Sequence, residues 1–401
     1  NNAESVARFF SVKSTYARWD HIVRKNNYPF CVLKRNLCVV SGIYPPESGG
    51  PAKFSATFSQ WASQRLTYTS VVTLTDGEDS LSKDKKVVIR KISRARNLLV
   101  RYLITATTVF KASKGAGILA NGMFIEVGLM HLLFRKKYVV KIPGDIVWER
   151  ARNTGKTKLE IDEFQKSKLP LKYKLFRTAF TFSLNSAKEV IVPSSHLRDL
   201  AISWGIKANK IQLVFNSISL ENFSYVGGAS KNIDVLTVSR LVSWKGLDEV
   251  ILACGKLNLN LTVVGDGPER SNLENLALKC GARVNFVGDI AQHLLPSIYS
   301  QSKYFVLNST FEATSYALLE ARACGVFSIA NSHTGSEDVI QHRIDGLLCK
   351  GTDGFTVESA LKFAIDNPDF VKSSLPRARI RTEQLFNMEI NFQKILELTT
   401  S

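Results

Sequence analysis

The chain has little cysteine, and its cysteines form no pattern that would organise a fold. Only 6 of the 401 residues are cysteine, with no CxxC pair and no neighbouring cluster of histidines. Neither a zinc site nor a disulfide scaffold is indicated. Reduced thiols are the default in a cytosol-like compartment, so we expect a cytoplasmic location.

Long apolar runs are also lacking. The longest apolar stretch, residues 117–134, contains Asn121, Glu126 and His131, which are costly at membrane depth. No segment is therefore expected to span a bilayer. The first residues include neither a methionine nor the apolar segment of a signal peptide, and whether a leader precedes Asn1 stays open.

What the chain does contain is typical of a globular protein, with one asymmetry of charge. Apolar residues make up 45% and charged residues 22%, which excludes disorder, collagen and coiled coil and leaves room for two domains. Residues 1–200 hold 34 Lys and Arg against 15 Asp and Glu, whereas residues 201–401 hold 19 against 20. The first half is thus expected to face something anionic: an acidic or phosphorylated acceptor, a membrane surface or nucleic acid.

Short β-type runs alternate with helical-period segments along most of the chain. The expected strands are 37–41, 68–74, 87–92, 116–120, 138–142, 189–192, 211–214, 234–238, 261–264, 283–286, 304–307, 327–329 and 346–349. The expected helices include 123–134, 196–204, 246–254, 269–279, 292–300, 315–324 and 357–366. This alternation predicts an α/β fold class with two doubly wound, Rossmann-like domains facing across a cleft, with the active residues in loops at the carboxyl ends of the strands.

Composition also suggests where the domains divide. We expect an N-terminal extension at 1–35, a first domain at 36–220, a linker at 221–231, a second domain at 232–384 and a terminal helix at 385–401. The linker is polar and contains two glycines. The last segment is amphipathic at helical spacing.

Two cations follow one strand of the second half. Arg240 and Lys245 lie five positions apart between a strand and a helix. Together with the exposed amides of the helix they would give positive potential suited to a diphosphate, and two solvated surface charges are the alternative.

Glycine motifs in the chain do not complete a dinucleotide fingerprint. The segment Gly265-Asp-Gly267 ends a strand, but Arg270 stands where the third glycine would fall. The segment 115–120 matches GxGxxA yet leads into a strand instead of following one, so we interpret it as a chance match.

Two glutamates separated by seven residues mark the most informative stretch. Glu312 lies in the loop after an expected strand and Glu320 lies inside the next helix, if Ser315 caps that helix. Eight residues at helical rise span about 12 Å. That separation is too long for an acid/base pair acting on one bond and suits two hydroxyl-bearing parts of one extended ligand.

The order and spacing of these motifs over about 120 residues resemble the C-terminal half of GT-B glycosyltransferases of family 4. The first half resembles the family more weakly, through Pro45-Pro46-Glu-Ser-Gly49-Gly50 and the segment 141–149. The resemblance implies two Rossmann-like domains, a nucleotide-sugar donor that is most often UDP-linked, retention of the anomeric configuration, and no metal or other cofactor. The implied partners are the donor and a glycan or lipid-linked acceptor.

The resemblance also implies roles for particular residues. The donor diphosphate would be bound by Arg240, Lys245, Gly49 and Gly50. The ribose would be bound by Glu320, and the transferred sugar by Glu312 together with the backbone at Ala313, Thr314 and Ser315. Asp145 and Glu312 are the residues expected to position or act on the reacting sugar.

Two departures from the family pattern bear on these expectations. The family often has Gly-Phe-Pro where this chain has Ala313-Thr314-Ser315, which leaves the donor sugar open. Its later Gly-Gly-Glu appears here as Gly335-Ser336-Glu337. The chain has no Asp-x-Asp sequence, so we expect cations instead of a chelated metal ion to balance the diphosphate.

Three alternatives remain beside transfer. A GT-B nucleotide-sugar epimerase or phosphorylase would share the fold and the donor site. A nucleic-acid-binding protein with a degenerate transferase-like half would explain the basic first half, although no stacking motif or reading helix supports it. The incomplete glycine fingerprint disfavours an NAD-linked oxidoreductase. The same basic half predicts contact with the cytoplasmic face of an anionic membrane.

Overall fold

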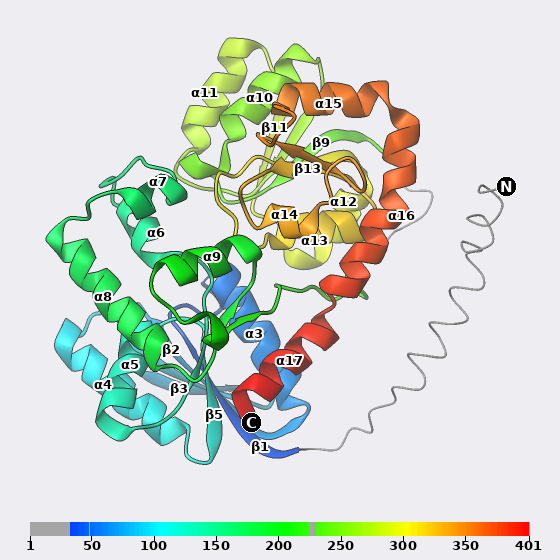
Figure 1. Cartoon of the computed structure of the whole chain (residues 1–401). Coiled ribbons are helices and arrows are strands. Elements are labelled where there is room, and N and C mark those ends of the chain that lie inside the picture. The colour runs from blue at the N-terminus through cyan, green and yellow to red at the C-terminus, as the bar shows by residue number, and fades with distance from the viewer. Residues whose placement is uncertain (1–32, 48, 225–229, 401) are drawn as a thin grey trace.

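A computed structural model of the chain describes residues 33–47, 49–224 and 230–400. Two lobes, each built on its own sheet, lie one beside the other (Figure 1). Nearly all of the expected N-terminal extension, and the middle of the expected linker, lie outside the described residues.

The first lobe contains an eight-stranded sheet in the order β3-β4-β2-β1-β5-β6-β7-β8. Its strands are β1 (Leu33–Ser41), β2 (Leu66–Thr75), β3 (Ser80–Asp84), β4 (Val87–Ser93), β5 (Ala116–Ala120), β6 (Val139–Lys141), β7 (Val190–Val192) and β8 (Ile211–Leu213). All neighbours pair in parallel except β3, which forms an antiparallel edge with β4. The α-helices of this lobe are α3 (Gly50–Ser63), α4 (Leu98–Ala112), α5 (Phe124–Phe134), α6 (Ile146–Asn153), α7 (Ile161–Lys166), α8 (Leu171–Ser186) and α9 (Ser195–Ser203).

The second lobe contains a parallel six-stranded sheet in the order β11-β10-β9-β12-β13-β14. Its strands are β9 (Ile233–Val238), β10 (Leu261–Val264), β11 (Val284–Gly288), β12 (Ser302–Leu307), β13 (Phe327–Asn331) and β14 (Leu347–Cys349). The α-helices are α10 (Leu247–Lys256), α11 (Arg270–Cys280), α12 (Leu295–Ser300), α13 (Tyr316–Ala323), α14 (Ser336–Val339), α15 (Val357–Asp366) and α16 (Pro368–Leu385). The two sheets, parallel except at the β3 edge and each wrapped by helices, confirm the predicted fold class.

Strand β1 shows why helices cover both faces of the first sheet. Its alternate residues are fully buried on opposite sides: Cys38 and Val40 join the core under α5 and α8, whereas Leu37 and Val39 join the core under α3. A strand that buries both faces needs an apolar run instead of alternation with polar residues, which is what the segment after Asn36 provides.

The last helix, α17 (Met388–Thr400), follows the long helix α16 and packs on the first lobe instead of the second (Figure 1). Phe392 lies edge-on to Phe54, Phe58 and Trp61 of α3, with ring centroids 5.1–5.8 Å apart. The amphipathic pattern of the segment is explained by this contact, since Ile395 and Leu396 are buried against the same sheet.

Some elements differ from the sequence expectations. The edge strand β3 is mostly exposed and polar, so it carries no apolar signal. The single helix expected at 292–300 is a 3₁₀ turn at Gln292–Leu294 followed by α12, with Pro296 in its first turn. The terminal helix begins at Met388, three residues later than expected, because Phe386 is buried where the chain bridges to Ile218.

Each sheet reverses its strand order once, between β1 and β5 in the first lobe and between β9 and β12 in the second. At such a point the loops leaving the two central strands separate to opposite faces and open a crevice at the carboxyl ends of the strands. The loops after these four strands carry Gly49 and Gly50, Asn121, the Arg240–Lys245 segment and the Glu312–Ser315 segment. The topology therefore brings most of the predicted site residues to one region.

Candidate functional site

A cavity of about 280 Å³ lies between the carboxyl ends of the two sheets and is lined by both lobes. Its lining from the first lobe is Gly50, Pro51, Phe54, Asn121, Lys141, Pro143, Glu149 and Asn216. Its lining from the second lobe is Trp244, Lys245 and the continuous segment 311–316. Of the predicted site residues, Gly50, Lys245, Glu312, Ala313, Thr314 and Ser315 line this cavity.

Lys245 and Glu312 form an ion pair at the cavity wall. Lys245 ends the 3₁₀ turn that precedes α10, and Glu312 lies in the loop between β12 and α13. Both side chains are more than four-fifths buried. The loops after β9 and β12 are held together beside the pair, because the amide of Thr310 donates to the carbonyl of Trp244 at 2.9 Å.

The loop of Ala313, Thr314 and Ser315 is fixed by its neighbours. Ser315 caps α13, as the sequence predicts, and its hydroxyl accepts from the amide of Leu318. A Cβ at Gly335 would lie 1.7 Å from the carbonyl oxygen of Ala313, so only glycine permits this packing. The Gly335-Ser336-Glu337 segment is thus a support for the loop that faces the cavity.

Glu320 is held by both lobes behind the cavity wall. It is 2% exposed, accepts a hydrogen bond from the Tyr299 hydroxyl at 3.1 Å, and pairs with Lys53 of α3. The Lys53 ammonium also lies 4.9 Å from the ring centroid of Tyr316, which does line the cavity. Glu320, the residue predicted to bind the ribose, is therefore paired with a lysine from the other lobe.

Arg240 and Gly49 lie outside the lining of the cavity. Arg240 is exposed, and within the described parts of the chain its side chain forms no ion pair or hydrogen bond. Its loop is anchored by the Gly265-Asp266-Gly267 turn: the amide of Leu241 donates to the backbone carbonyl of Asp266, and a Cβ at Gly267 would lie 2.3 Å from the carbonyl oxygen of Leu241. These glycines allow one loop to approach another, not a ligand.

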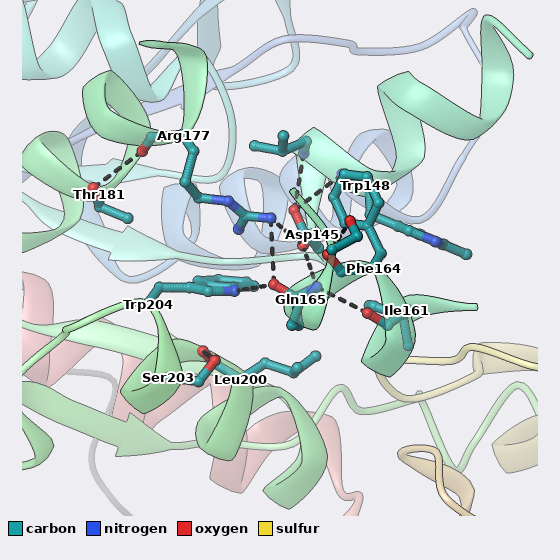
Figure 2. Close-up of polar contacts among 12 residues, drawn as sticks. Asp145, Trp148, Ile161, Phe164, Gln165, Arg177, Thr181, Leu200, Ser203 and Trp204 are labelled. Carbon is teal, nitrogen blue, oxygen red and sulfur yellow. Dashed lines mark hydrogen bonds and ion pairs between the residues drawn. The ribbon is translucent and has the colours of Figure 1, made fainter. Parts of the chain in front are cut away.

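Asp145 is the prediction that fits the structure least. Its carboxylate is fully buried, caps α6 by accepting from the amides of Val147 and Trp148, and receives Gln165 at 3.0 Å and Arg177 at 2.6 Å (Figure 2). It is not part of the cavity lining. A carboxylate with four donors has no lone pair left for a sugar, so its geometry is that of a structural cap and not of the expected catalytic residue.

Glu149, one turn further along α6, is the carboxylate of this segment that does line the cavity. Burial, together with the nearby Asp145, raises its pKa to about 7, and Lys245 opposes this shift. Glu149 ends the segment 141–149 that resembles the family, and the resemblance implied no role for it. The signal that identifies it is helical spacing, because position 149 lies one turn from the buried cap at 145.

Lys141 and Asn121 were also missed. Lys141 is the last residue of β6 and is 2% exposed. Burial lowers its pKa to about 7. Asn121 follows β5 and donates to Ser55 and to the carbonyl of Pro51, while its own carbonyl oxygen is buried with no protein partner among the described residues. Both residues follow from one rule: polar residues at the carboxyl end of a central strand face the crevice.

Two lobes of this topology, with a cavity at both switch points, define the class of GT-B proteins. The family described as "Glycosyl transferases group 1" matches residues 221–381, which is the second lobe with most of α16. The second lobe is thus similar to this family, and the two-lobed arrangement of the chain is the GT-B fold.

Solved structures agree over nearly the whole chain. Sucrose-phosphate synthase from Thermosynechococcus elongatus has a TM-score of 0.74 at 19% identity and covers 91% of this chain and 98% of its own. Anabaena HepE in complex with UDP-glucose has a TM-score of 0.72 at 16% identity, with 90% and 98% coverage. At these identities the likeness is one of fold.

Curated relatives match over a smaller share of the chain. A GDP-mannose-dependent alpha-mannosyltransferase of Corynebacterium glutamicum is 28% identical over 46% of each chain. An uncharacterized glycosyltransferase of Haemophilus influenzae is 29% identical over 42% of this chain and 48% of its own. These alignments span about half the length of the relatives.

Proposed function

We propose that this chain is a retaining glycosyltransferase that transfers a sugar from a nucleotide sugar, most simply UDP-linked, to an anionic glycan or lipid-linked acceptor. The observation that carries the proposal is the convergence of Lys245, Glu312 and the 313–315 loop in one cavity between the lobes. Group transfer from a diphosphate needs positive charge where the leaving group forms and hydroxyl-binding groups around the sugar.

The donor would lie across the second lobe. Its diphosphate would contact Lys245 in the cavity and the uncommitted Arg240 where the loop reaches solvent. The ribose hydroxyls would bind Glu320 after Lys53 moves away from it. The transferred sugar would bind Glu312. For this the Lys245–Glu312 ion pair would break, so that Glu312 accepts from the sugar hydroxyls and Lys245 binds the phosphate.

The reacting end of the sugar would face the first lobe. Glu149 lines that side of the cavity, so we assign it the role near the sugar that the sequence analysis gave to Asp145. With a pKa near 7, it can donate or accept a hydrogen bond at neutral pH. Retention of configuration and independence of metal are carried over from the family resemblance.

UDP is the proposed nucleotide because HepE, a structural neighbour over almost the whole chain, is described in complex with UDP and with UDP-glucose. The mannosyltransferase relative is GDP-mannose-dependent, so GDP-mannose is the competing donor. Nothing in the cavity lining reads the base, and the nucleotide is decided by experiment.

A basic surface of the first lobe, away from the cleft, supports binding of an anionic partner there. A cavity of about 500 Å³ is lined by Arg135, Lys136, Lys137 and Lys188. It lies at the amino ends of β5 and β6, whereas the active-site cavity lies at their carboxyl ends. We therefore propose that these cations dock the enzyme on an anionic membrane and leave the reacting acceptor to the cleft. Among the described helices, none has both the length and the apolar composition needed to cross a bilayer.

A thermal-shift panel with UDP-glucose, UDP-N-acetylglucosamine and GDP-mannose tests the donor site. One donor should raise the melting temperature, and Lys245→Met should abolish that shift. Lys256→Met is the matched control, because Lys256 is a surface cation of α10 paired with Glu358 outside the cavity. A shift that survives in Lys245→Met, or no shift with any nucleotide sugar, would overturn the proposal.

Product analysis separates transfer from its alternatives. With the preferred donor and an added acceptor, a new glycoside with the donor's anomeric configuration is expected by NMR. Conversion of the donor sugar without an acceptor would indicate an epimerase, and release of sugar phosphate with inorganic phosphate would indicate a phosphorylase.

A further inference from the structure

Lys141 places a buried ammonium at the active-site cavity without an acidic partner. The side chain is 2% exposed, its Nζ donates to Asn216 Oδ1 at 2.8 Å, and Nζ lies 4.4 Å from the ring centroid of Phe54. Across the described residues no carboxylate pairs with it. A buried cation without a counter-charge is costly, so a lysine kept in this position calls for an anion.

The other charged groups of the cavity do not supply that anion. Lys245, Glu149 and Glu312 line the same space. Glu312 is committed to Lys245, and burial raises the pKa of Glu149 to about 7, so it is only partly ionised at neutral pH. Burial is likewise the cause that lowers the pKa of Lys141 to about 7. At neutral pH the cavity therefore holds no full negative charge that is free to pair with Lys141, and an anion that enters it would favour the ammonium form of this lysine.

A hydrogen-bonded side chain links Lys141 to the loop that precedes α13. Asn216, which accepts from the ammonium, donates its own amide to the carbonyl of Thr314 at 3.0 Å. Lys141 is thus tied through one side chain to the segment that precedes α13. A group bound between this segment and Lys245 would meet one cation from each lobe.

We propose that Lys141 is a phosphate-binding residue, and that a phosphate group entering the cleft is the counter-ion it lacks. The phosphate belongs either to the donor diphosphate or to a phosphorylated acceptor. The inference deepens the proposed function and rests on it for the ligand. It adds a charged side chain of the first lobe to the groups that recognise the phosphate.

Proton uptake on binding follows from this role. An anion beside the ammonium raises the pKa of Lys141, so binding at pH 8 loads a proton that the free protein has partly lost. Glu149 faces the same cavity and would contribute uptake of the same sign. The measurement therefore compares Lys141→Met with Glu149→Gln as well as with the unmodified chain.

The experiment is calorimetric titration of the full chain with UDP, uridine and inorganic phosphate at pH 8 in Tris and in HEPES. Lys141→Met should weaken UDP at least about tenfold, the loss of a charge-assisted hydrogen bond, and leave uridine unchanged. Proton uptake should fall in this variant more than in Glu149→Gln. Lys111→Met, an exposed lysine at the end of α4 outside the cavity, should match the unmodified chain.

The titrations show whether the phosphate comes from the donor or from the acceptor. They also separate a failure of this inference from a failure of the proposed function. If Lys141→Met weakens inorganic phosphate binding to the UDP-saturated protein but not UDP itself, the acceptor phosphate is the ligand. If both bind as in the unmodified chain, this inference is wrong while the donor site stands. If the unmodified chain binds neither, the proposed function fails as well. Methionine is apolar and similar in length to lysine. If a melting curve shows that Lys141→Met does not fold, Lys141→Gln serves as the second variant.

Discussion

At the scale of single residues, the question for Asp145 is whether its carboxylate is a structural cap or a catalytic group. Its carboxylate joins α6, α7 and α8 through Gln165 and Arg177 (Figure 2). Asp145→Ala removes a cap and leaves Arg177 unpaired, which should cost about 3 kcal/mol in the free energy of unfolding. Urea denaturation measures this. Asp199→Ala, an exposed acid of α9, should cost little. Normal stability with lost activity in Asp145→Ala would restore the catalytic assignment.

Glu149 makes a prediction about pH at the same scale. Its pKa is raised from 4.5 to about 7, so the folded state holds a proton that the unfolded chain releases near pH 4.5. That contribution to stability is present below pH 4.5 and is lost as pH rises through about 7. Glu149→Gln should therefore melt above the unmodified chain at pH 8 and close to it at pH 4.5. Parallel melting curves of the two proteins across this range would contradict the shift.

At the scale of elements, α17 is the segment that joins the end of the chain to the first sheet. Phe392 packs on three aromatic rings of α3, and Phe392→Ala should cost about 3–5 kcal/mol. Thermal unfolding of the variant should show the first lobe destabilised. Ile390→Ala, an exposed position of the same helix, is the control. Equal stability of the two variants would mean that the packing of α17 does not stabilise the first lobe.

The elements also show how far the sequence could predict the structure. Apolar runs such as 116–120 and 261–264 gave strand bounds to the residue, because buried parallel strands have little polar content. Lys141 and Glu149 were not predicted as site residues, since their importance comes from two loops of different lobes meeting in space. The cap made by Asp145 could not be predicted, because a polar residue after a strand can serve as a helix cap as well as a ligand.

At the scale of the whole molecule, Lys53 and Glu320 join the lobes. The pair links α3 to α13, and Trp148 of the first lobe packs near Trp244 and Phe311 of the second. In Lys53→Met the buried Glu320 gains solvation only if the lobes separate, so the ligand-free variant should open and show a larger radius of gyration by X-ray scattering. Lys83→Met, on the exposed edge strand, should leave the radius unchanged, and an unchanged radius in Lys53→Met would contradict the role of the pair.

The charge asymmetry predicts membrane docking at the same scale. Replacing both Lys136 and Lys137 with Glu should reduce sedimentation with vesicles of phosphatidylglycerol and phosphatidylcholine by more than tenfold at low salt, since each cation contributes about 1 kcal/mol near an anionic surface. Donor binding should be unchanged, because the basic cavity and the cleft lie at opposite ends of β5 and β6. Undiminished vesicle binding by the variant would show that these lysines are not the docking surface.

A crystal structure of the chain with UDP would show whether one phosphate-bearing donor sits between the two lobes. We expect a diphosphate within hydrogen-bond distance of the Lys245 ammonium, with Glu320 released from Lys53 to the ribose. A nucleotide bound away from the cleft, with the Lys245–Glu312 and Lys53–Glu320 pairs both intact, would contradict it.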